Sequence, residues 1–240
     1  MENNISDKFT EEIESIKSSY LLRKNIGFYK YHPLNPSIFM TVQEKERKLI
    51  KWLKSFDLIE INKLNLLEIG CGTGQNLLQF IKLGFSPNRI VGNELLPERV
   101  EQAKIILPGS VKIIEGDALK ADFPTEYFDI VFQSMVFSSI LNEEFKIALA
   151  KKMWRLTRPG GGILWYDFTY NNPKNPNVKG ITFKELEKLF PDTKITKWHL
   201  TLAPPITRIV TRIHPVLYHV FNFFPFLRTH ILCWISKNDE

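Results

Sequence analysis

The sequence predicts an α/β fold with a seven-stranded, mostly parallel sheet that carries helices on both faces. From Asn65 onward, short apolar runs end in turn residues and are followed by helical segments, which is the pattern of strand–helix–strand units. Such units place their strands side by side and parallel in one sheet. We expect strands at residues 65–69, 89–93, 111–115, 128–133, 163–168, 195–201 and 230–236.

Start signals mark the helices between these strands. Pro97 lies at a first helical position, Asn142 is placed to cap a helix, and Thr182-Phe183-Lys184-Glu185 matches a capping box. The alternation of strands and helices therefore continues through the middle of the chain. The helix after Asn142 should bury one apolar face, made of Phe145, Leu149, Met153 and Leu156.

Two more helices are expected before the first strand, and together they would form an N-terminal helical cap over residues 1–60. The first should run from Thr10 to about Lys24, after which prolines at 33 and 36 predict a loop. The second should open at Thr41, because Thr41-Val42-Gln43-Glu44 matches a capping box. Residues 61–240 would then form the main domain. The buried stripe of the second helix is expected to be Leu49, Leu53 and Phe56.

The composition is that of an ordinary globular protein. Of 240 residues, 44% are hydrophobic and 24% are charged, which excludes collagen-like, disordered and coiled-coil chains. The two cysteines, Cys71 and Cys233, are too few for a disulfide scaffold, which indicates a reducing compartment. Residues 1–30 contain no long apolar run, and nowhere do about 18 uncharged apolar residues follow one another. We expect a cytoplasmic protein without a membrane span.

The strongest local signal is the segment 66–76, which reads Leu-Leu-Glu-Ile-Gly-Cys-Gly-Thr-Gly-Gln-Asn. It consists of an apolar strand that runs into a Gly-x-Gly-x-Gly turn and then into a helix. Glycines let the chain turn tightly and let a ligand touch bare backbone, while the first N–H groups of the helix point at an anionic part of that ligand. The turn therefore predicts a ligand site at the end of the first strand.

Carboxylates stand at the ends of the neighbouring strands. Glu94 ends the second strand, 24 residues after Gly70, where it can accept hydrogen bonds from both hydroxyls of a ribose. Asp117 ends the third strand, and Glu68 adds a third carboxylate to the pocket. These charges would repel a pyrophosphate, and Gln75 stands where a dinucleotide-binding turn needs its third glycine. An adenosine ligand with a positive charge fits better.

Taken in order, these motifs resemble the class I S-adenosylmethionine-dependent methyltransferases over roughly residues 60–240. They are the turn at 68–74, Glu94, Gly116-Asp117-Ala118, the strand at 128–133 and the run 156–162. The resemblance implies a Rossmann-like fold and S-adenosylmethionine as the cofactor. It assigns the methionine part of the cofactor to Glu68 and to the turn residues Gly70, Cys71, Gly72 and Gly74. It assigns the ribose to Glu94 and the adenine to Asp117 and Ala118, and it places Leu95 and Gln133 beside the cofactor.

Candidates for a general base come from the carboxyl ends of the strands, where an open α/β sheet places its ligands. Asp167, at the mouth of the fifth strand, is the first candidate, and its alternative role is to bond backbone N–H groups of the next loop. His199 is the second candidate, since a histidine can titrate near neutral pH. We expect no metal, because Asp167 with Asn171 and Asn172 is too small a set of ligands.

The C-terminal part of the chain is basic, because residues 193–238 carry six Lys or Arg, four His and no Asp or Glu. Between the expected sixth and seventh strands lies an insertion at about 203–229. Its first helix should carry an apolar face, made of Ile206, Ile209, Val210 and Ile213, opposite Arg208 and Arg212. Residues 213–227 then contain five aromatics and no formal charge. We expect a helical lid over the active site with its aromatics buried; the alternative is a peripheral contact of 206–228 with the cytoplasmic face of a membrane.

We expect the acceptor to be a small molecule, a sugar or a lipid-linked glycan that is methylated on oxygen. Lys197, Arg208 or Arg212 would meet a phosphate, and the runs 165–173 and 202–205 are loosely similar to methyltransferases of bacterial surface-polysaccharide pathways. A quinone-like lipid and RNA are alternative acceptors, and a non-catalytic module that binds S-adenosylmethionine is the alternative to an enzyme. Nucleic acid is disfavoured, because the basic residues are interleaved with apolar ones rather than clustered.

Overall fold

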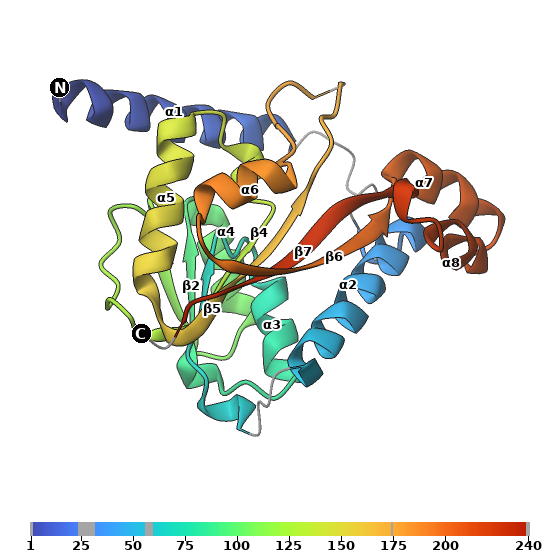
Figure 1. Ribbon diagram of the computed structural model, residues 1–240, viewed down its shortest axis with the longest axis horizontal. Coiled ribbons are helices and arrows are strands. Elements are labelled where there is room, and N and C mark those ends of the chain that lie inside the picture. Colours follow the sequence, from blue (N-terminus) through green and yellow to red (C-terminus); the bar gives the residue numbers. More distant parts are fainter. Residues whose placement is uncertain (1, 24–31, 56–59, 174, 239–240) are drawn as a thin grey trace.

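The computed structural model describes residues 2–23, 32–55, 60–173 and 175–238. One seven-stranded sheet runs through its centre in the order β3-β2-β1-β4-β5-β7-β6 (Figure 1). Each expected strand is present, so the predicted α/β class is confirmed. The strands are β1 (Leu66–Ile69), β2 (Ile90–Glu94), β3 (Lys112–Glu115), β4 (Phe128–Ser134), β5 (Thr157–Phe168), β6 (Lys194–Leu202) and β7 (Arg228–Ser236).

Every strand of this sheet except β7 points the same way. The strands β3, β2, β1, β4 and β5 pair in parallel, while β7 is antiparallel to both β5 and β6. The carboxyl ends of the parallel strands therefore lie along one edge of the sheet, which we call the carboxyl edge. Strand β5 begins earlier than predicted because Thr157 pairs with Phe128 before the register shifts and Gly162 pairs with Ile130.

Helices cover both faces of the sheet, as predicted. On one face, α2 (Pro36–Ser55), α3 (Gln75–Lys82) and α4 (Pro97–Ile106) share an apolar core with the strands. On the other face, α5 (Glu143–Leu156) and α6 (Phe183–Leu189) form a second core. The predicted apolar face of α5 is buried in this second core; it consists of Phe145, Leu149, Met153 and Leu156.

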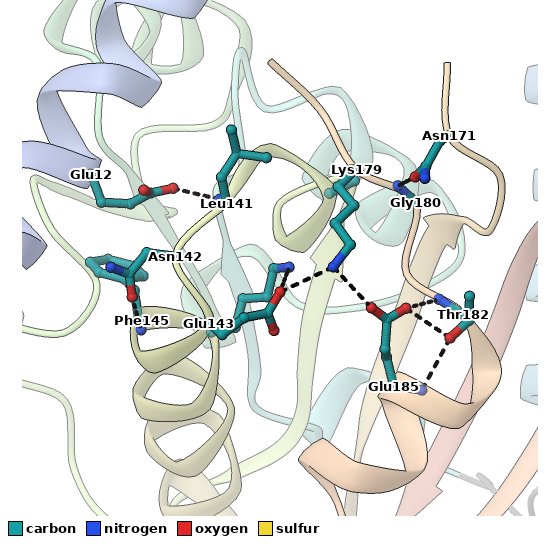
Figure 2. Close-up of polar contacts among 12 residues, drawn as sticks. Glu12, Leu141, Asn142, Glu143, Phe145, Asn171, Lys179, Gly180, Thr182 and Glu185 are labelled. Carbon is teal, nitrogen blue, oxygen red and sulfur yellow. Dashed lines mark hydrogen bonds and ion pairs between the residues drawn. The ribbon is translucent and has the colours of Figure 1, made fainter. Parts of the chain in front are cut away.

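The predicted start signals of α4, α5 and α6 are confirmed. Pro97 is the first residue of α4. The Oδ1 atom of Asn142 accepts the N–H of Phe145 at 2.9 Å where α5 starts (Figure 2). Thr182 and Glu185 form the expected capping box at the start of α6, each side chain accepting the backbone N–H of the other residue.

The predicted start of the second helix is wrong. The helix begins at Pro36, and the Oδ1 atom of Asn35 accepts the N–H and the hydroxyl of Ser37 at 3.1 and 2.9 Å. Thr41 lies inside the helix, where its hydroxyl donates to the carbonyl of Ser37 at 2.9 Å. The proline that was expected to extend the loop instead occupies the first helical position, where its missing N–H costs no hydrogen bond.

The two N-terminal helices do not form a single cap. Helix α2 buries Leu49 and Leu53 against one face of the sheet, as predicted, whereas Phe56 lies outside the described residues. Helix α1 (Glu2–Arg23) begins before the expected Thr10 and lies at the carboxyl edge, next to the start of α5 (Figure 1). The segment 1–60 therefore contributes to two separate parts of the molecule.

Polar and aromatic contacts hold α1 in place. The Oε1 atom of Glu12 accepts the N–H of Leu141 at 2.5 Å, in the loop just before α5 (Figure 2). The ring of Phe9 meets the ring of Phe145 edge-on, with centroids 5.0 Å apart. Helix α1 is thereby fixed next to the residues that begin α5.

The insertion between β6 and β7 consists of α7 (Pro204–Ile213), α8 (Val216–Asn222) and a short 3₁₀ turn (Pro225–Leu227). The expectation that its aromatics are buried is wrong, since Tyr218 is buried while Phe221, Phe223, Phe224 and Phe226 are exposed. Within the described residues, no helix combines the length and the apolar content needed to cross a bilayer.

The predicted apolar face of α7 is also wrong in part. Val210 is buried, but Ile209 and Ile213 are 63% and 72% exposed. Thr207 and Thr211 are buried instead, and their hydroxyls donate to the carbonyls of Leu202 and Thr207 at 2.8 and 2.7 Å. A threonine that bonds an earlier carbonyl in this way can enter an apolar interface, which a count of apolar residues misses.

A buried carboxylate joins α2 to the insertion. The Oε2 atom of Glu44 accepts the N–H of Thr201 at 2.9 Å and the hydroxyl of Tyr218 at 2.5 Å. Its Oε1 atom accepts the amide of Asn222 at 2.7 Å. Thr201, the last residue but one of β6, has a φ of +67°, a strained conformation for a β-branched residue. The three hydrogen bonds offset the cost of burying the charge and hold α8 against α2.

We predict that Glu44→Ala destabilises the fold by on the order of 3 kcal/mol, because it leaves the buried Thr201 N–H and Tyr218 hydroxyl without an acceptor. Urea unfolding followed by circular dichroism measures the free energy of unfolding. Glu46→Ala, on the same helix and more accessible to solvent, is the control and should change this free energy by less than about 0.5 kcal/mol. Equal stability of the two variants would contradict the role given to Glu44.

Candidate functional site

A cavity of about 450 Å³ lies at the carboxyl edge, bounded by α1, the glycine turn and the ends of β2, β3 and β4. Its size falls in the range of small-molecule pockets, roughly 300 to 1,000 Å³. Helix α1 lines it with Ile13, Ile16 and Tyr20, and α5 lines it with Phe145 and Leu149. The cavity is therefore closed by the N-terminal helix and not by the C-terminal insertion.

The predicted cofactor residues divide into two groups. Seven of them line the cavity, namely Gly70, Cys71, Gly72, Glu94, Leu95, Asp117 and Ala118. Three do not line it, namely Glu68, Gly74 and Gln133. The second group supports the wall from behind through hydrogen bonds and packing.

The glycine turn needs its glycines. Gly70, Gly72 and Gly74 have φ angles of +67°, +58° and +82°, which residues with a side chain rarely adopt. A side chain at Gly70 would lie 2.5 Å from Val136, whereas at Gly72 the nearest atom is 4.0 Å away, on Arg99. Gly72 thus presents bare backbone to the cavity, while Gly74 packs against Leu107 and begins α3.

Glu94 fixes this turn to the end of β2. The side chain is 4% exposed, and its Oε2 atom accepts the N–H of Gly72 at 2.8 Å. Its Oε1 atom accepts the N–H of Leu96 at 2.9 Å. A carboxylate offers about four acceptor sites, so both oxygens can still accept a hydrogen bond from a ligand.

The end of β3 contributes a second acid to the wall. Gly116 has a φ of +111° and no atom within 4 Å of the place where a side chain would begin, so the wall is open there. The Oδ1 atom of Asp117 accepts the N–H of Leu119 at 2.9 Å, which orients the carboxylate, and Ala118 follows in the wall. Asp117 therefore holds a turn after β3 and also lies in the cavity wall.

Glu68 lies beneath the turn and faces α2. Its Oε1 atom accepts the amide of Asn76 at 2.6 Å, and the Oδ1 atom of Asn76 accepts the ammonium of Lys45 at 2.7 Å. The same ammonium lies 5.2 Å from the ring centroid of Tyr166. Burial raises the pKa of Glu68 to about 8 and lowers the pKa of Lys45. Nothing in the sequence indicates that Lys45 belongs to this site, because its helix is remote from the glycine turn along the chain.

Gln133 and Asp167 hold the loop that follows β4. Gln133 is fully buried, and its Oε1 atom accepts the N–H of Val136 at 3.0 Å. Asp167 is fully buried as well, and its oxygens accept the N–H groups of Ser138 and Phe168 at 3.1 and 2.9 Å. Asp167 therefore bonds backbone N–H groups, but the loop that it holds is the one after β4 and not, as expected, the one after β5.

Neither predicted catalytic side chain lines the cavity. Asp167 is enclosed by the loop that it supports, and His199 is exposed on β6. Partial burial and the charges of Lys197 and Arg228 lower the pKa of His199. The geometry thus gives no support to Asp167 or His199 as the general base.

Sequence reasoning also missed two contributors to the wall. Tyr20 and Arg99 meet across the cavity, with the guanidinium carbon of Arg99 4.3 Å from the centroid of the Tyr20 ring. The spacing of Ile13, Ile16 and Tyr20 places them on one helix face, so the sequence indicates an apolar stripe there. It does not indicate that this stripe lines the cavity. Among the described residues, no group of three or more His, Cys, Asp or Glu is arranged to hold a metal ion.

We predict that Asp167 makes stability depend on pH. Burial raises its pKa to about 7, against an ordinary value of 3.8, and the hydrogen bonds from Ser138 and Phe168 offset this only in part. The folded state therefore holds the proton more tightly than the unfolded state. The contribution of Asp167 to the free energy of unfolding is therefore smallest above pH 7 and increases as the pH falls toward 4.

Asp167→Asn should remove this dependence. When the pH falls from 8 to 5, the free energy of unfolding of the wild type should increase by on the order of 2 to 3 kcal/mol relative to that of the variant. Urea unfolding at each pH measures this difference. A constant difference between the two proteins over that range would show that Asp167 titrates normally.

Comparison with known proteins places this site in a family. A family described as "Methyltransferase domain" matches residues 66–161, which run from β1 into β5. An uncharacterized methyltransferase of Bacillus cytotoxicus is 29% identical over 75% of this chain and 80% of its own length. A ubiquinone/menaquinone biosynthesis C-methyltransferase of Stutzerimonas stutzeri is 28% identical over 43% of this chain, and the match spans only 41% of that protein.

A solved structure with the same fold is an S-adenosylmethionine-dependent methyltransferase from Mesorhizobium loti. It superimposes with a TM-score of 0.56 over 78% of this chain and 96% of its own, at 14% identity. At that identity the likeness concerns the fold, while the matched segment 66–161 carries the turn, Glu94 and Asp117. Residues 66–161 therefore match a methyltransferase domain, and the fold is that of solved S-adenosylmethionine-dependent methyltransferases.

Proposed function

We propose that this methyltransferase acts on a small apolar acceptor that carries an acidic hydroxyl, such as a phenol or a hydroquinone. The observation that carries this proposal is the make-up of the cavity wall, which combines carboxylates and bare backbone at the strand ends with apolar side chains from α1 and α5. Such side chains favour an apolar ring or chain over a sugar. The cofactor fills much of a cavity of about 450 Å³, so only the reacting end of the acceptor would enter.

The residues at the strand ends fit S-adenosylmethionine. Glu94 keeps acceptor sites that two ribose hydroxyls could use, and Asp117 with Ala118 would contact the adenine. Arg99 contributes a cation that would meet the carboxylate of the methionine part, close to the bare backbone of Gly72. When bound, S-adenosylmethionine supplies a methyl group on a positively charged sulfur, already activated for transfer.

The choice of an acidic hydroxyl comes from the groups available to accept its proton. The carboxylates in the described wall, Glu94 and Asp117, are held by backbone N–H groups and are placed for the adenosine. Burial raises the pKa of the Cys71 thiol, so this group stays protonated near neutral pH. A general base typically contributes about 3 to 5 kcal/mol, whereas alignment of the reactants can contribute about 7 to 11 kcal/mol. An acceptor that ionises easily could therefore react through alignment alone.

One relative supports a ring acceptor. The Stutzerimonas protein carries the name of a C-methyltransferase of quinone biosynthesis, and it is 28% identical over 43% of this chain. A hydroquinone is apolar, and its hydroxyls ionise far more readily than those of a sugar. Its electron-rich ring could accept the methyl group on carbon or, after ionisation, on oxygen.

The expected glycan acceptor has less support. Lys197 lies 3.5 Å from the ring centroid of Phe183, and Arg208 and Arg212 are exposed on α7. None of these three cations lines the cavity, so the phosphate contact that they were expected to make would not take place there. A sugar hydroxyl would in addition need a base that the described wall does not offer.

The acceptor is tested by incubating the protein with isotope-labelled S-adenosylmethionine and four acceptors: a demethylated hydroquinone, a simple phenol, a lipid-linked glycan and RNA. We predict labelled product with the hydroquinone or the phenol, identified by mass spectrometry. Product with the glycan or RNA, and none with either ring compound, would overturn the proposal.

We predict that Glu94→Ala weakens binding of S-adenosylmethionine by roughly 5- to 150-fold, because two backbone N–H groups and the ribose lose their acceptor. Isothermal titration calorimetry measures the affinity. Glu101→Ala is the matched control, since Glu101 is an exposed acid on α4 that pairs with Lys104 at 2.8 Å. If the two variants bound the cofactor equally well, Glu94 would not be part of its site.

A further inference from the structure

The exposed apolar side chains of this protein concentrate on the insertion. Among the described residues, 18 large apolar side chains are exposed, and eight of them lie between residues 209 and 226. Single exposed apolar residues are ordinary on a soluble protein, but a cluster marks a contact surface. In Figure 1 this cluster, on α7 and α8, lies at the opposite end of the long axis from the start of α1.

The outward face of α7 is divided between charge and apolar surface. Thr207, Val210 and Thr211 are buried, so the opposite side of the helix faces outward. At 100° per residue, that side carries Arg208 and Arg212 along one half and Ile209 and Ile213 along the other. All four side chains are exposed.

Helix α8 and the turn after it continue the apolar surface. Val216 and Val220 are 56% and 53% exposed on α8, and Phe223 and Phe226 are 78% and 73% exposed beyond it. The rings of Phe223 and Phe226 each contact Phe224, with centroids 5.8 Å apart. We call the outward face of residues 204–227 the docking surface.

The docking surface is held rigidly in its outward orientation. Tyr218 points inward to Glu44, and it packs in a small core with Met40, Leu202 and Val210. The guanidinium of Arg228 donates to the carbonyl of Asn222 at 2.6 and 2.9 Å, which fixes the end of α8. The phenylalanines are therefore exposed on a well-anchored element, and not on a segment without contacts.

Charge decides what covers this surface. Residues 193–238 contain no Asp or Glu, so no acid of the insertion neutralises Arg208 and Arg212. A second copy of the chain, docked by a two-fold axis, would bring the same arginines together without an acid between them. An anionic bilayer satisfies both features, because its headgroups attract arginine and its acyl region accepts aliphatic and aromatic side chains. We propose that the docking surface binds the face of a bilayer that contains anionic lipid.

The placement of the docking surface adds to this inference. The insertion begins where β6 ends, at the carboxyl edge that also holds the cavity. A bilayer bound there would lie beside the edge that holds the cavity. The inference does not depend on the proposed acceptor, since lipid binding can be measured without any turnover.

Vesicle flotation tests the proposal with the full chain. Vesicles of phosphatidylcholine alone are compared with vesicles that also contain phosphatidylglycerol, at low and physiological salt. The wild type should float with the anionic vesicles and much less with the neutral ones. Absence of flotation with both, or equal flotation with both, would overturn the proposal.

Two double variants separate the apolar and the cationic contributions. The variant with Phe223→Ser and Phe226→Ser should bind anionic vesicles at least tenfold more weakly than the wild type. The variant with Arg208→Gln and Arg212→Gln should bind them roughly thirtyfold more weakly. The control pair, Ile105→Ser with Tyr170→Ser, changes two side chains that are 83% and 59% exposed elsewhere and should bind as the wild type does. Thermal unfolding confirms that each variant is folded.

Two further outcomes would assign the surface to another occupant and overturn the proposal. Analytical ultracentrifugation could reveal a dimer that the phenylalanine variants dissociate, in which case the occupant is a second copy. Salt-dependent RNA binding that the arginine variants abolish, without flotation of the wild type, would indicate nucleic acid.

Discussion

The contact between the Glu94 carboxylate and the glycine turn is the constraint on which the site depends. The turn takes left-handed backbone angles at its three glycines, and Glu94 accepts the N–H of Gly72 within the turn and the N–H of Leu96 just after β2. This holds the turn open toward the cavity before any ligand arrives. The same carboxylate also gives the cavity a negative charge, which suits a cofactor whose sulfur is positive. One side chain therefore serves both the fold and the electrostatics of the site.

Helix α2 links the site to the docking surface through two adjacent side chains. Lys45 reaches Asn76 and, through it, Glu68 beneath the glycine turn, while Glu44 reaches Tyr218 and Asn222 on α8. Between them, the hydroxyl groups of Tyr166 and Thr201 lie 2.9 Å apart, and the ammonium of Lys45 lies over the Tyr166 ring. A continuous set of contacts thus runs from the glycine turn to the insertion. Polar contacts as well as apolar packing therefore hold α2 against the sheet and the insertion.

The parts that the sequence predicted are those set by local chemistry. The strands, the glycine turn, the caps at Asn142 and Thr182 and the positions of Glu94 and Asp117 all follow from neighbouring residues. The errors concern contacts between distant segments. The sequence predicts that Glu44 is half of a capping box. Nothing near it in sequence reveals that its partners are Thr201, Tyr218 and Asn222. Asp167 is a candidate general base by sequence, because it lies at a strand end. The sequence does not show that the loop after β4 closes over it. The predicted apolar face of α7 is wrong in part because two of its buried residues are threonines, which a count of apolar residues leaves out.

A crystal structure with S-adenosylhomocysteine tests the central claim most directly. The account predicts that the two ribose hydroxyls bond the carboxylate of Glu94, that the adenine lies beside Asp117 and Ala118, and that the amino acid end lies along Gly70 to Gly72. A ligand bound elsewhere, or bound in this cavity with its ribose away from Glu94, would contradict it.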